Sequence, residues 1–111
     1  MPKPGDIILV PFPFTDLSGD KVRPALILAS VGSNSIMAMI SSTRHGKKWP
    51  SDYDILDNDA DFAASGLKVS SRIHLGKLAT IEAKIILGQL GFLTQKHCQQ
   101  INKKLARLFG Y

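Results

Sequence analysis

The chain has 111 residues, which is enough for one domain and short for two, so we expect a single domain over residues 1–111. Its composition, 44% hydrophobic and 21% charged, excludes a disordered chain, and no apolar run approaches the ~18 residues of a membrane span. The net charge is +5, although five of the nine acids lie within residues 52–61. The rest is strongly basic, which suits a polyanionic partner such as nucleic acid, or a solvated basic face.

The single cysteine, Cys98, excludes an internal disulfide and favours a reducing compartment. The first ten residues contain no apolar stretch of signal-peptide length. We therefore expect a cytoplasmic protein with no membrane association.

The first half of the chain has the pattern of short strands. Apolar runs rich in branched residues cover 6–12, 25–30 and 35–41, and they are typical of strands buried on both faces. A short strand over 53–56, helical turns over 59–66 that end at Gly66, and extended segments over 67–75 and 82–93 follow. This spacing predicts a mainly β fold, as a small barrel or sandwich.

The tail has a helical period. From Thr94, the apolar residues recur at spacings of three and four and form one helix face: Cys98, Ile101, Leu105 and Leu108. Thr94 can cap the start, Leu93 can pack onto Cys98, and Gly110 fits the end. The opposite, basic face either contacts RNA or is simply solvated.

The sequence favours neither metal nor cofactor chemistry. His45, His74 and His97 are scattered, and no Cys or His pair has ligand spacing. The aspartates of residues 52–61 could hold Mg²⁺, but a solvated acidic loop fits them better. Glycine-rich phosphate and dinucleotide motifs and a serine-hydrolase elbow are absent. We expect no metal and no cofactor.

RNA cleavage needs none of these groups, because the ribose 2′-hydroxyl can serve as the nucleophile. Arg23, which Pro24 holds at the start of a strand, has the planar guanidinium that grips two phosphate oxygens. A hydroxyl of Ser41 or Ser42, after the third apolar run, could orient the same phosphate. The alternative is that Arg23 only pairs with a carboxylate such as Asp6 or Asp16.

Two aromatic residues and a basic segment are further candidates for RNA contact. Phe14 could stack on a base, whereas strand alternation directs Phe12 into the core. Trp49 follows a basic segment in which Arg44 and the two lysines at 47–48 could track the phosphate backbone.

The stretch PGDIILVPFPFTDLSGDKVRPALIL, followed by MAMISST, SGLKVSSRIHLGKLATIE and ILGQLG, resembles the MazF/PemK-like toxins of bacterial toxin–antitoxin pairs. The resemblance covers nearly the whole chain, and its first 30 residues are the specific part. It implies a small SH3-like β-barrel with helices, including the C-terminal amphipathic helix, and a homodimer. It also implies metal-independent cleavage of single-stranded RNA at short sequences, giving 2′,3′-cyclic phosphate and 5′-hydroxyl ends.

The resemblance assigns the family's catalytic arginine to Arg23 and its threonine to Ser41, which keeps the hydroxyl and loses the methyl group. An Arg–x–Asp pair of some members falls on His74 and Gly76, so the carboxylate is missing. His74 is the best candidate for the general base, with a solvent-facing strand histidine as the alternative. We further expect RNA contacts from a set in the loops and at strand ends: Phe14, Thr15, Lys21, Ser42, Thr43, Arg44 and Lys77.

The expected partners are single-stranded RNA, a cognate antitoxin and a second copy of the chain, with operator DNA bound through the toxin–antitoxin complex. The missing carboxylate at Gly76 keeps an alternative open. The chain could be a non-enzymatic toxin on the same barrel, such as a gyrase poison, or an inactive relative.

Overall fold

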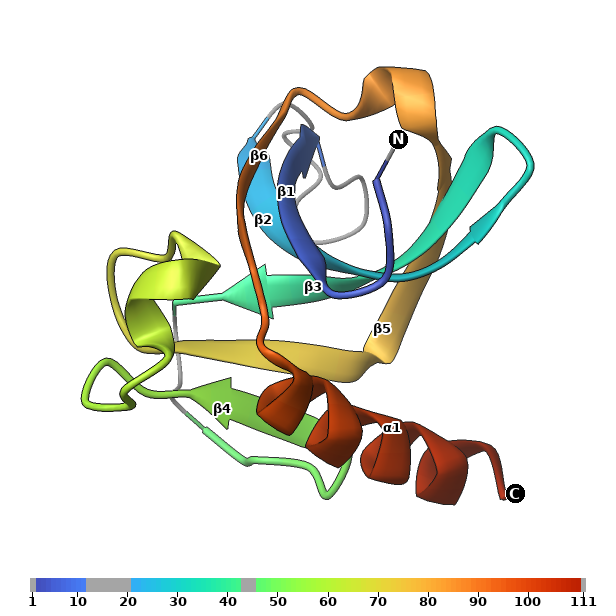
Figure 1. Cartoon of the computed structure of the whole chain (residues 1–111). Coiled ribbons are helices and arrows are strands. Elements are labelled where there is room, and N and C mark those ends of the chain that lie inside the picture. Colours follow the sequence, from blue (N-terminus) through green and yellow to red (C-terminus); the bar gives the residue numbers. More distant parts are fainter. Residues whose placement is uncertain (1, 12–20, 43–45, 111) are drawn as a thin grey trace.

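The structure is a computed structural model that describes residues 2–11, 21–42 and 46–110 (Figure 1). Its elements in chain order are β1 (Asp6–Pro11), β2 (Val22–Val31), β3 (Asn34–Ser41), β4 (Asp52–Ile55), the 3₁₀ helix η1 (Phe62–Ser65), β5 (Ser71–Glu82), the 3₁₀ helix η2 (Ala83–Ile85), β6 (Gly88–Phe92) and α1 (Gln95–Phe109). The six strands form one sheet in the order β4-β5-β3-β2-β1-β6, and every neighbouring pair is antiparallel. The expectation of a mainly β fold with a C-terminal helix is confirmed.

The sheet curls into a half-barrel because β5 bends sharply. Ala38 pairs with Leu78 but its neighbour Met39 pairs with His74, so β5 carries three extra residues between two adjacent rungs. Extra residues on one strand bend it and increase its twist. As Figure 1 shows, β1, β2 and β6 curl over one end of the molecule, while β4 and the first part of β5 lie beside α1 at the other.

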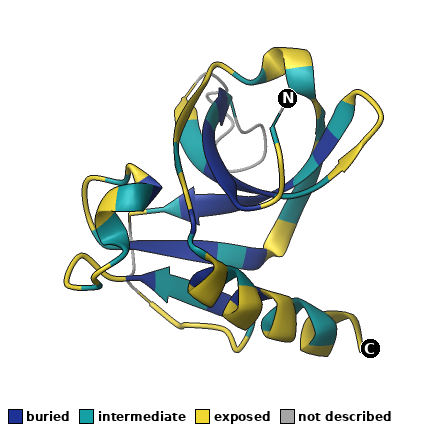
Figure 2. Ribbon diagram, in the orientation of Figure 1, coloured by how far each residue is buried: buried dark blue, intermediate teal, exposed yellow. Residues whose placement is uncertain are grey.

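Each face of the sheet buries its own apolar cluster, as the buried strand centres of Figure 2 show. The larger cluster lies on the side covered by α1 and includes Leu26, Ile40, Ile73 and Ile101. The smaller cluster, on the other face, includes Ala25 and Ile27, which flank Leu26 in β2, together with Val10, Met37 and Met39. Burial on both faces confirms the interpretation of the continuous apolar runs.

The expected helical turns and extended segments are largely confirmed. The turns near residue 62 form η1, and Gly66 ends them with a φ of +72°, a left-handed conformation that favours glycine. The segment 82–93, expected to be extended, is interrupted by η2 before β6 begins. The interruption lets the chain cross from the end of β5 to the far edge of the sheet, beside β1.

Helix α1 begins after Thr94 and ends at Gly110, as expected. Thr94 is the N-cap residue, but its hydroxyl donates to Asp61 Oδ2 at 2.8 Å and makes no capping hydrogen bond to the helix. Leu108 continues the apolar face but is 43% exposed, because the last turn of α1 extends past the larger cluster. No helix in the described part of the chain is both long and apolar enough to cross a membrane.

Candidate functional site

The predicted residues Arg23 and Ser41 lie at the same end of two neighbouring strands. The pairing of β2 with β3 ends at Ala25 and Met39, and Arg23 and Ser41 each lie two residues beyond that pair on the same face. Ser41 pairs on its other side with Arg72 of β5. We call Arg23, Ser41 and Arg72 the row; it lies at the edge where β2 begins and β3 ends.

The two arginines of this row have different partners. Arg72 is buried and makes a two-pronged contact with Asp54 of β4, with Nε–Oδ1 at 2.8 Å and Nη2–Oδ2 at 3.2 Å. Lys48 also approaches Asp54, at 3.6 Å. The hydrogen bonds to Asp54 are the main cause that raises the pKa of Arg72. Arg72 is therefore held in a structural ion pair.

Arg23 is half-buried, and within the described residues no hydrogen bond or ion pair joins it to a carboxylate. Asp6, one of its two possible partners from the sequence, instead accepts from the backbone N–H of Lys3 at 2.9 Å. The other, Asp16, lies outside the described residues. This arrangement favours the phosphate-binding interpretation of Arg23 over a pairing with Asp6.

His74 lies one rung further along the same face, opposite Met39 and Asp52. Diagonal neighbours across antiparallel strands lie roughly 7–8 Å apart, so its imidazole is close to Ser41. Its Nδ1 lies 3.5 Å from Oδ1 of the buried Asp52, an ion-pair distance that is longer than a good hydrogen bond. The other oxygen of Asp52 accepts from the Trp49 N–H at 2.9 Å. Asp52 is thus fixed beside the histidine.

Burial lowers the pKa of His74, and the positive charges of Lys77 and Arg72 lower it further, whereas Asp52 raises it. The imidazole is consequently neutral near pH 7 and has a lone pair available for a proton. The alternative from the sequence, a strand histidine in open solvent, is wrong, because His74 is only 18% exposed.

A pocket of about 520 Å³ opens beside His74, where β5 bends and the C-terminal half of α1 crosses it. Its wall carries both basic and apolar side chains, and its lining residues are Trp49, Pro50, Ser51, Asp52, His74, Gly76, Lys77, Lys104, Arg107 and Leu108. The Lys104 ammonium donates to the Pro50 carbonyl at 2.9 Å, which ties α1 to the segment before β4. Such a wall suits an anionic ligand that also carries a flat or apolar group.

The family model of the PemK-like, MazF-like toxins of type II toxin–antitoxin systems matches residues 3–109. The chain belongs to this family. No curated protein sequence matches it significantly. Solved structures with the same fold include an endoribonuclease in complex with its cognate antitoxin from a mycobacterial species, at 16% identity and a TM-score of 0.75, covering 99% of this chain and 96% of that one. A MazF of Deinococcus radiodurans has 19% identity and a TM-score of 0.73, with 99% and 97% covered. The Mycobacterium tuberculosis toxin MazF-mt6 has 21% identity and a TM-score of 0.72, with 95% and 96% covered.

Some members of the PemK/MazF-like family have a carboxylate at the position where this chain has Gly76. In this chain, Asp52 lies near that position. Gly76 lines the same pocket as His74, and Asp52 reaches the pocket from the neighbouring strand β4. The acidic neighbour of His74 is therefore present, but it comes from a different strand.

The predicted RNA-contact residues separate into three groups. Lys21 and Ser42 are exposed at the same sheet edge as Arg23 and Ser41, and Lys77 is exposed at the pocket. The others lie outside the described residues: Phe14, Thr15, Thr43 and Arg44.

Sequence reasoning missed Arg72, Asp52 and Asp54, although a weak signal was present. The alternating patterns of 52–55 and 71–75 place charged side chains on one strand face and apolar ones on the other. Only the pairing of β4 with β5 shows that these two charged faces are the same face.

Proposed function

We propose that this chain is the endoribonuclease toxin of a toxin–antitoxin pair, and that it cleaves single-stranded RNA at short specific sequences without a metal ion. One observation carries the proposal: Arg23, with no carboxylate paired to it in the described residues, shares a row with Ser41 and a face with the neutral imidazole of His74. Family membership supports it, as do neighbours of the same fold that are named endoribonucleases.

The residues divide the chemistry as follows. His74 takes the proton of the ribose 2′-hydroxyl, whose oxygen forms a bond to phosphorus as the bond from phosphorus to the 5′-oxygen breaks. The 5′-oxygen leaves with a proton from water or a protonated side chain. The products are a 2′,3′-cyclic phosphate and a 5′-hydroxyl.

Arg23 binds the phosphate oxygens and stabilises the additional negative charge of the pentavalent transition state. The Ser41 hydroxyl orients the same phosphate. Asp52 acts as a positioning residue, since its charge favours the imidazolium that forms when His74 accepts a proton.

The basic pocket wall of Lys77, Lys104 and Arg107 supports two further parts of the proposal. It can hold flanking phosphates of the RNA, and it can bind an acidic segment of a cognate antitoxin. The solved mycobacterial endoribonuclease of the same fold is itself in complex with its cognate antitoxin. High salt should then slow the association of the antitoxin. Cytoplasmic location and operator DNA binding through the complex complete this proposal.

The test is cleavage of single-stranded RNA by the wild type, Arg23→Ala and Lys84→Ala. Lys84 is an exposed cation outside the row, paired to Glu82, so its loss controls for a general change of charge. We expect cleavage in EDTA, no cleavage when the ribose at the cut site is 2′-deoxyribose, and a loss on the order of 10²–10³ for Arg23→Ala alone.

Equal rates for the wild type and Arg23→Ala would show that Arg23 plays no part in cleavage. Absence of cleavage by every folded variant, on a library of RNA sequences, would favour the non-enzymatic toxin of the same fold.

A further inference from the structure

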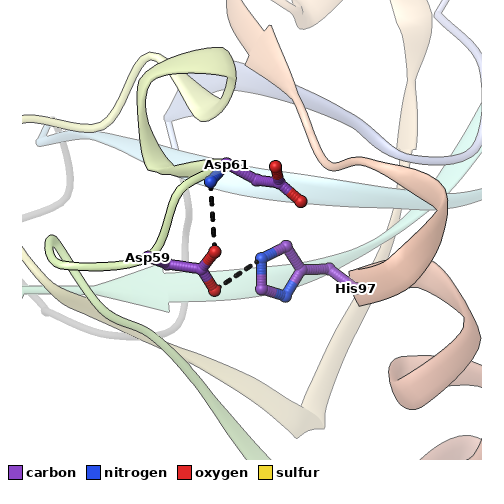
Figure 3. A group of neighbouring side chains, drawn as sticks. All are labelled: Asp59, Asp61 and His97. Carbon is purple, nitrogen blue, oxygen red and sulfur yellow. Dashed lines mark hydrogen bonds and ion pairs between the residues drawn. The ribbon is translucent and has the colours of Figure 1, made fainter.

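A second group of polar side chains lies on the other side of the molecule, at the start of α1. Asp59 and Asp61 come from the loop between β4 and η1, and His97 comes from the first turns of the helix (Figure 3). One potential ligand atom from each of these three residues lies within 4.8 Å of the other two. His97 Nε2 and Asp59 Oδ2 are 3.0 Å apart.

His97 is deeply buried, with 5% of its side chain exposed, yet its Nε2 makes no hydrogen bond in the described part of the chain. Asp59 Oδ2 lies at ion-pair distance from Nε2, but the contact is not a hydrogen bond. A buried polar atom without a partner destabilises a fold unless something else meets it. Nε2 is directed toward the Asp59 carboxylate, and the Asp61 carboxylate lies beside the ring (Figure 3).

The other ring nitrogen of His97 is already engaged. Nδ1 lies 2.7 Å from the Tyr53 hydroxyl, and these two atoms share one hydrogen bond. When Nδ1 carries the proton and donates it to Tyr53, the Nε2 lone pair faces the carboxylates, and a cation between them satisfies all three groups.

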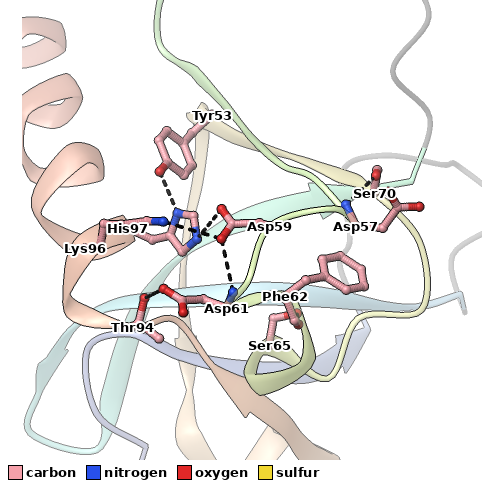
Figure 4. A network of polar contacts seen from close by, with 10 residues as sticks. All are labelled: Tyr53, Asp57, Asp59, Asp61, Phe62, Ser65, Ser70, Thr94, Lys96 and His97. Atoms are coloured by element: carbon pink, nitrogen blue, oxygen red, sulfur yellow. Dashed lines mark hydrogen bonds and ion pairs between the residues drawn. The ribbon is translucent and has the colours of Figure 1, made fainter.

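The surrounding contacts hold the two carboxylates in place (Figure 4). Asp59 Oδ1 accepts from the Asp61 N–H at 3.1 Å and from Lys96 Nζ at 3.4 Å. Asp61 Oδ2 accepts from the Thr94 hydroxyl at 2.8 Å. Each carboxylate is therefore oriented through one oxygen, as ligands oriented by a second shell of contacts are.

We infer that Asp59, Asp61 and His97 form a binding site for a divalent transition-metal ion, with Zn²⁺ the best chemical fit. One imidazole and two carboxylates match Zn²⁺, whereas Mg²⁺ and Ca²⁺ prefer oxygen ligands alone. Bonds of about 2.0–2.2 Å place ligand atoms of a tetrahedral Zn²⁺ roughly 3.4 Å apart. The Nε2–Oδ2 separation is already near that value, and rotation of the Asp61 carboxylate can close the remainder. Water takes the fourth position.

The charges of the site also fit a dication. The two carboxylates carry two negative charges, and Lys96, whose side chain is 63% exposed, offsets only part of them and can turn into solvent. The sequence showed no such site, because the acids and the histidine lie far apart in the chain and meet only when α1 packs beside the loop.

The site lies on the opposite side of the sheet from the row of Arg23. Tyr53 packs against the larger apolar cluster on the α1 side, whereas its neighbours Asp52 and Asp54 point to the other face. A metal ion here would tie the acidic loop to α1, so its role is structural. Its removal should lower stability and leave the cleavage residues in place.

The test is titration of the untagged, chelator-treated full chain with Zn²⁺ alone, by calorimetry and by thermal unfolding. The double variant Asp59→Asn/Asp61→Asn keeps an oxygen acceptor at both positions but removes both anionic ligands. Asp57→Asn is the matched control, because Asp57 is an exposed acid of the same loop outside the three.

We expect the wild type and Asp57→Asn to bind one Zn²⁺ per chain. Their unfolding temperatures should rise by roughly 5–15 °C when Zn²⁺ is a hundredfold above Kd. The double variant should fold, bind at least tenfold more weakly, and show a much smaller rise. Equal binding by the double variant and the wild type, or no stoichiometric binding by the wild type, would overturn the proposal.

Co²⁺ gives a second readout that does not depend on the variants. In the wild type, Co²⁺ should produce visible absorption bands of a four-coordinate site and should shift the ring proton resonances of His97 in NMR spectra, and Zn²⁺ should reverse both. Shifts of the His74 resonances and not of the His97 resonances would show that the ion binds at another site, and would also overturn the proposal.

Discussion

Replacing His74 with glutamine keeps a polar side chain of similar size in the pocket but removes the group that we propose takes the proton. A positioned general base typically contributes 10²–10⁴ in rate, and we expect kcat/KM to fall within that range. Binding of RNA should change far less, because the neighbouring cation Lys77 remains.

Asp52→Asn tests the effect of the neighbouring charge on the rate while the base His74 stays in place. Two unit charges 3.5 Å apart interact by about 1 kcal/mol in water and by about 5 kcal/mol at the effective dielectric of about 20 that suits a pair as buried as this one. Loss of that stabilisation of the imidazolium therefore lowers the rate by roughly fivefold at least. Because the base itself remains, the effect of Asp52→Asn should not exceed that of His74→Gln.

The pH dependence of kcat/KM has a definite direction. Burial lowers the pKa of His74 from its ordinary 6.5, so the wild type should keep its full rate as the pH falls through 6.5 and should lose it only below. Because Asp52 raises this pKa, Asp52→Asn should move the acidic limb to still lower pH.

The assay is cleavage of a short fluorescent RNA between pH 4.5 and 8, with circular dichroism at each pH to confirm folding. A wild-type profile unchanged in His74→Gln would refute the assignment of His74 as the base. An acidic limb that moves upward in Asp52→Asn would refute the electrostatic reasoning.

Three further predictions concern stability, reactivity and assembly. Gly91→Ala should destabilise the fold by about 3 kcal/mol or more, because the added Cβ would clash with the Ala64 carbonyl oxygen. Gly88→Ala on the same strand is the control, since its Cβ meets nothing within 4 Å. An equal loss of stability for both variants in urea unfolding would contradict this. Cys98 should react with a thiol reagent far more slowly in the native than in the denatured protein, because burial raises the pKa of its thiol and so lowers the thiolate fraction. Rapid labelling of the native protein would show that Cys98 is not a packing residue. The chain should form a symmetric homodimer, and light scattering that finds only a 12.1 kDa species at micromolar concentration would exclude it.

Local sequence patterns predicted most of the secondary structure. Continuous apolar runs became strands buried on both faces, and the three-four spacing from Cys98 to Leu105 became the buried side of α1. These predictions succeed because the period of hydrophobic residues is a property of neighbouring positions alone. The same period continues to Leu108, which lies past the larger cluster and is exposed, so the period alone does not say where burial stops.

The candidate site was predictable only in part. Arg23 and Ser41 were candidates from residue type and position, His74 was added from the resemblance, and strand register places the three on one face. Arg72 and its partner Asp54 were not found, since nothing within the chain near residue 72 indicates which strand will lie beside it.

The amino-acid sequence by itself determined the class of fold, the basic character of the surface, the terminal helix and the family of this chain. The tertiary structure alone decided which charges meet: Asp52 with His74 across two strands, and Asp59 with His97 between a loop and a helix. The reason is physical. Periodicity is set by backbone geometry over a few residues, whereas contacts between distant residues depend on strand register, on the bend of β5 and on where α1 packs.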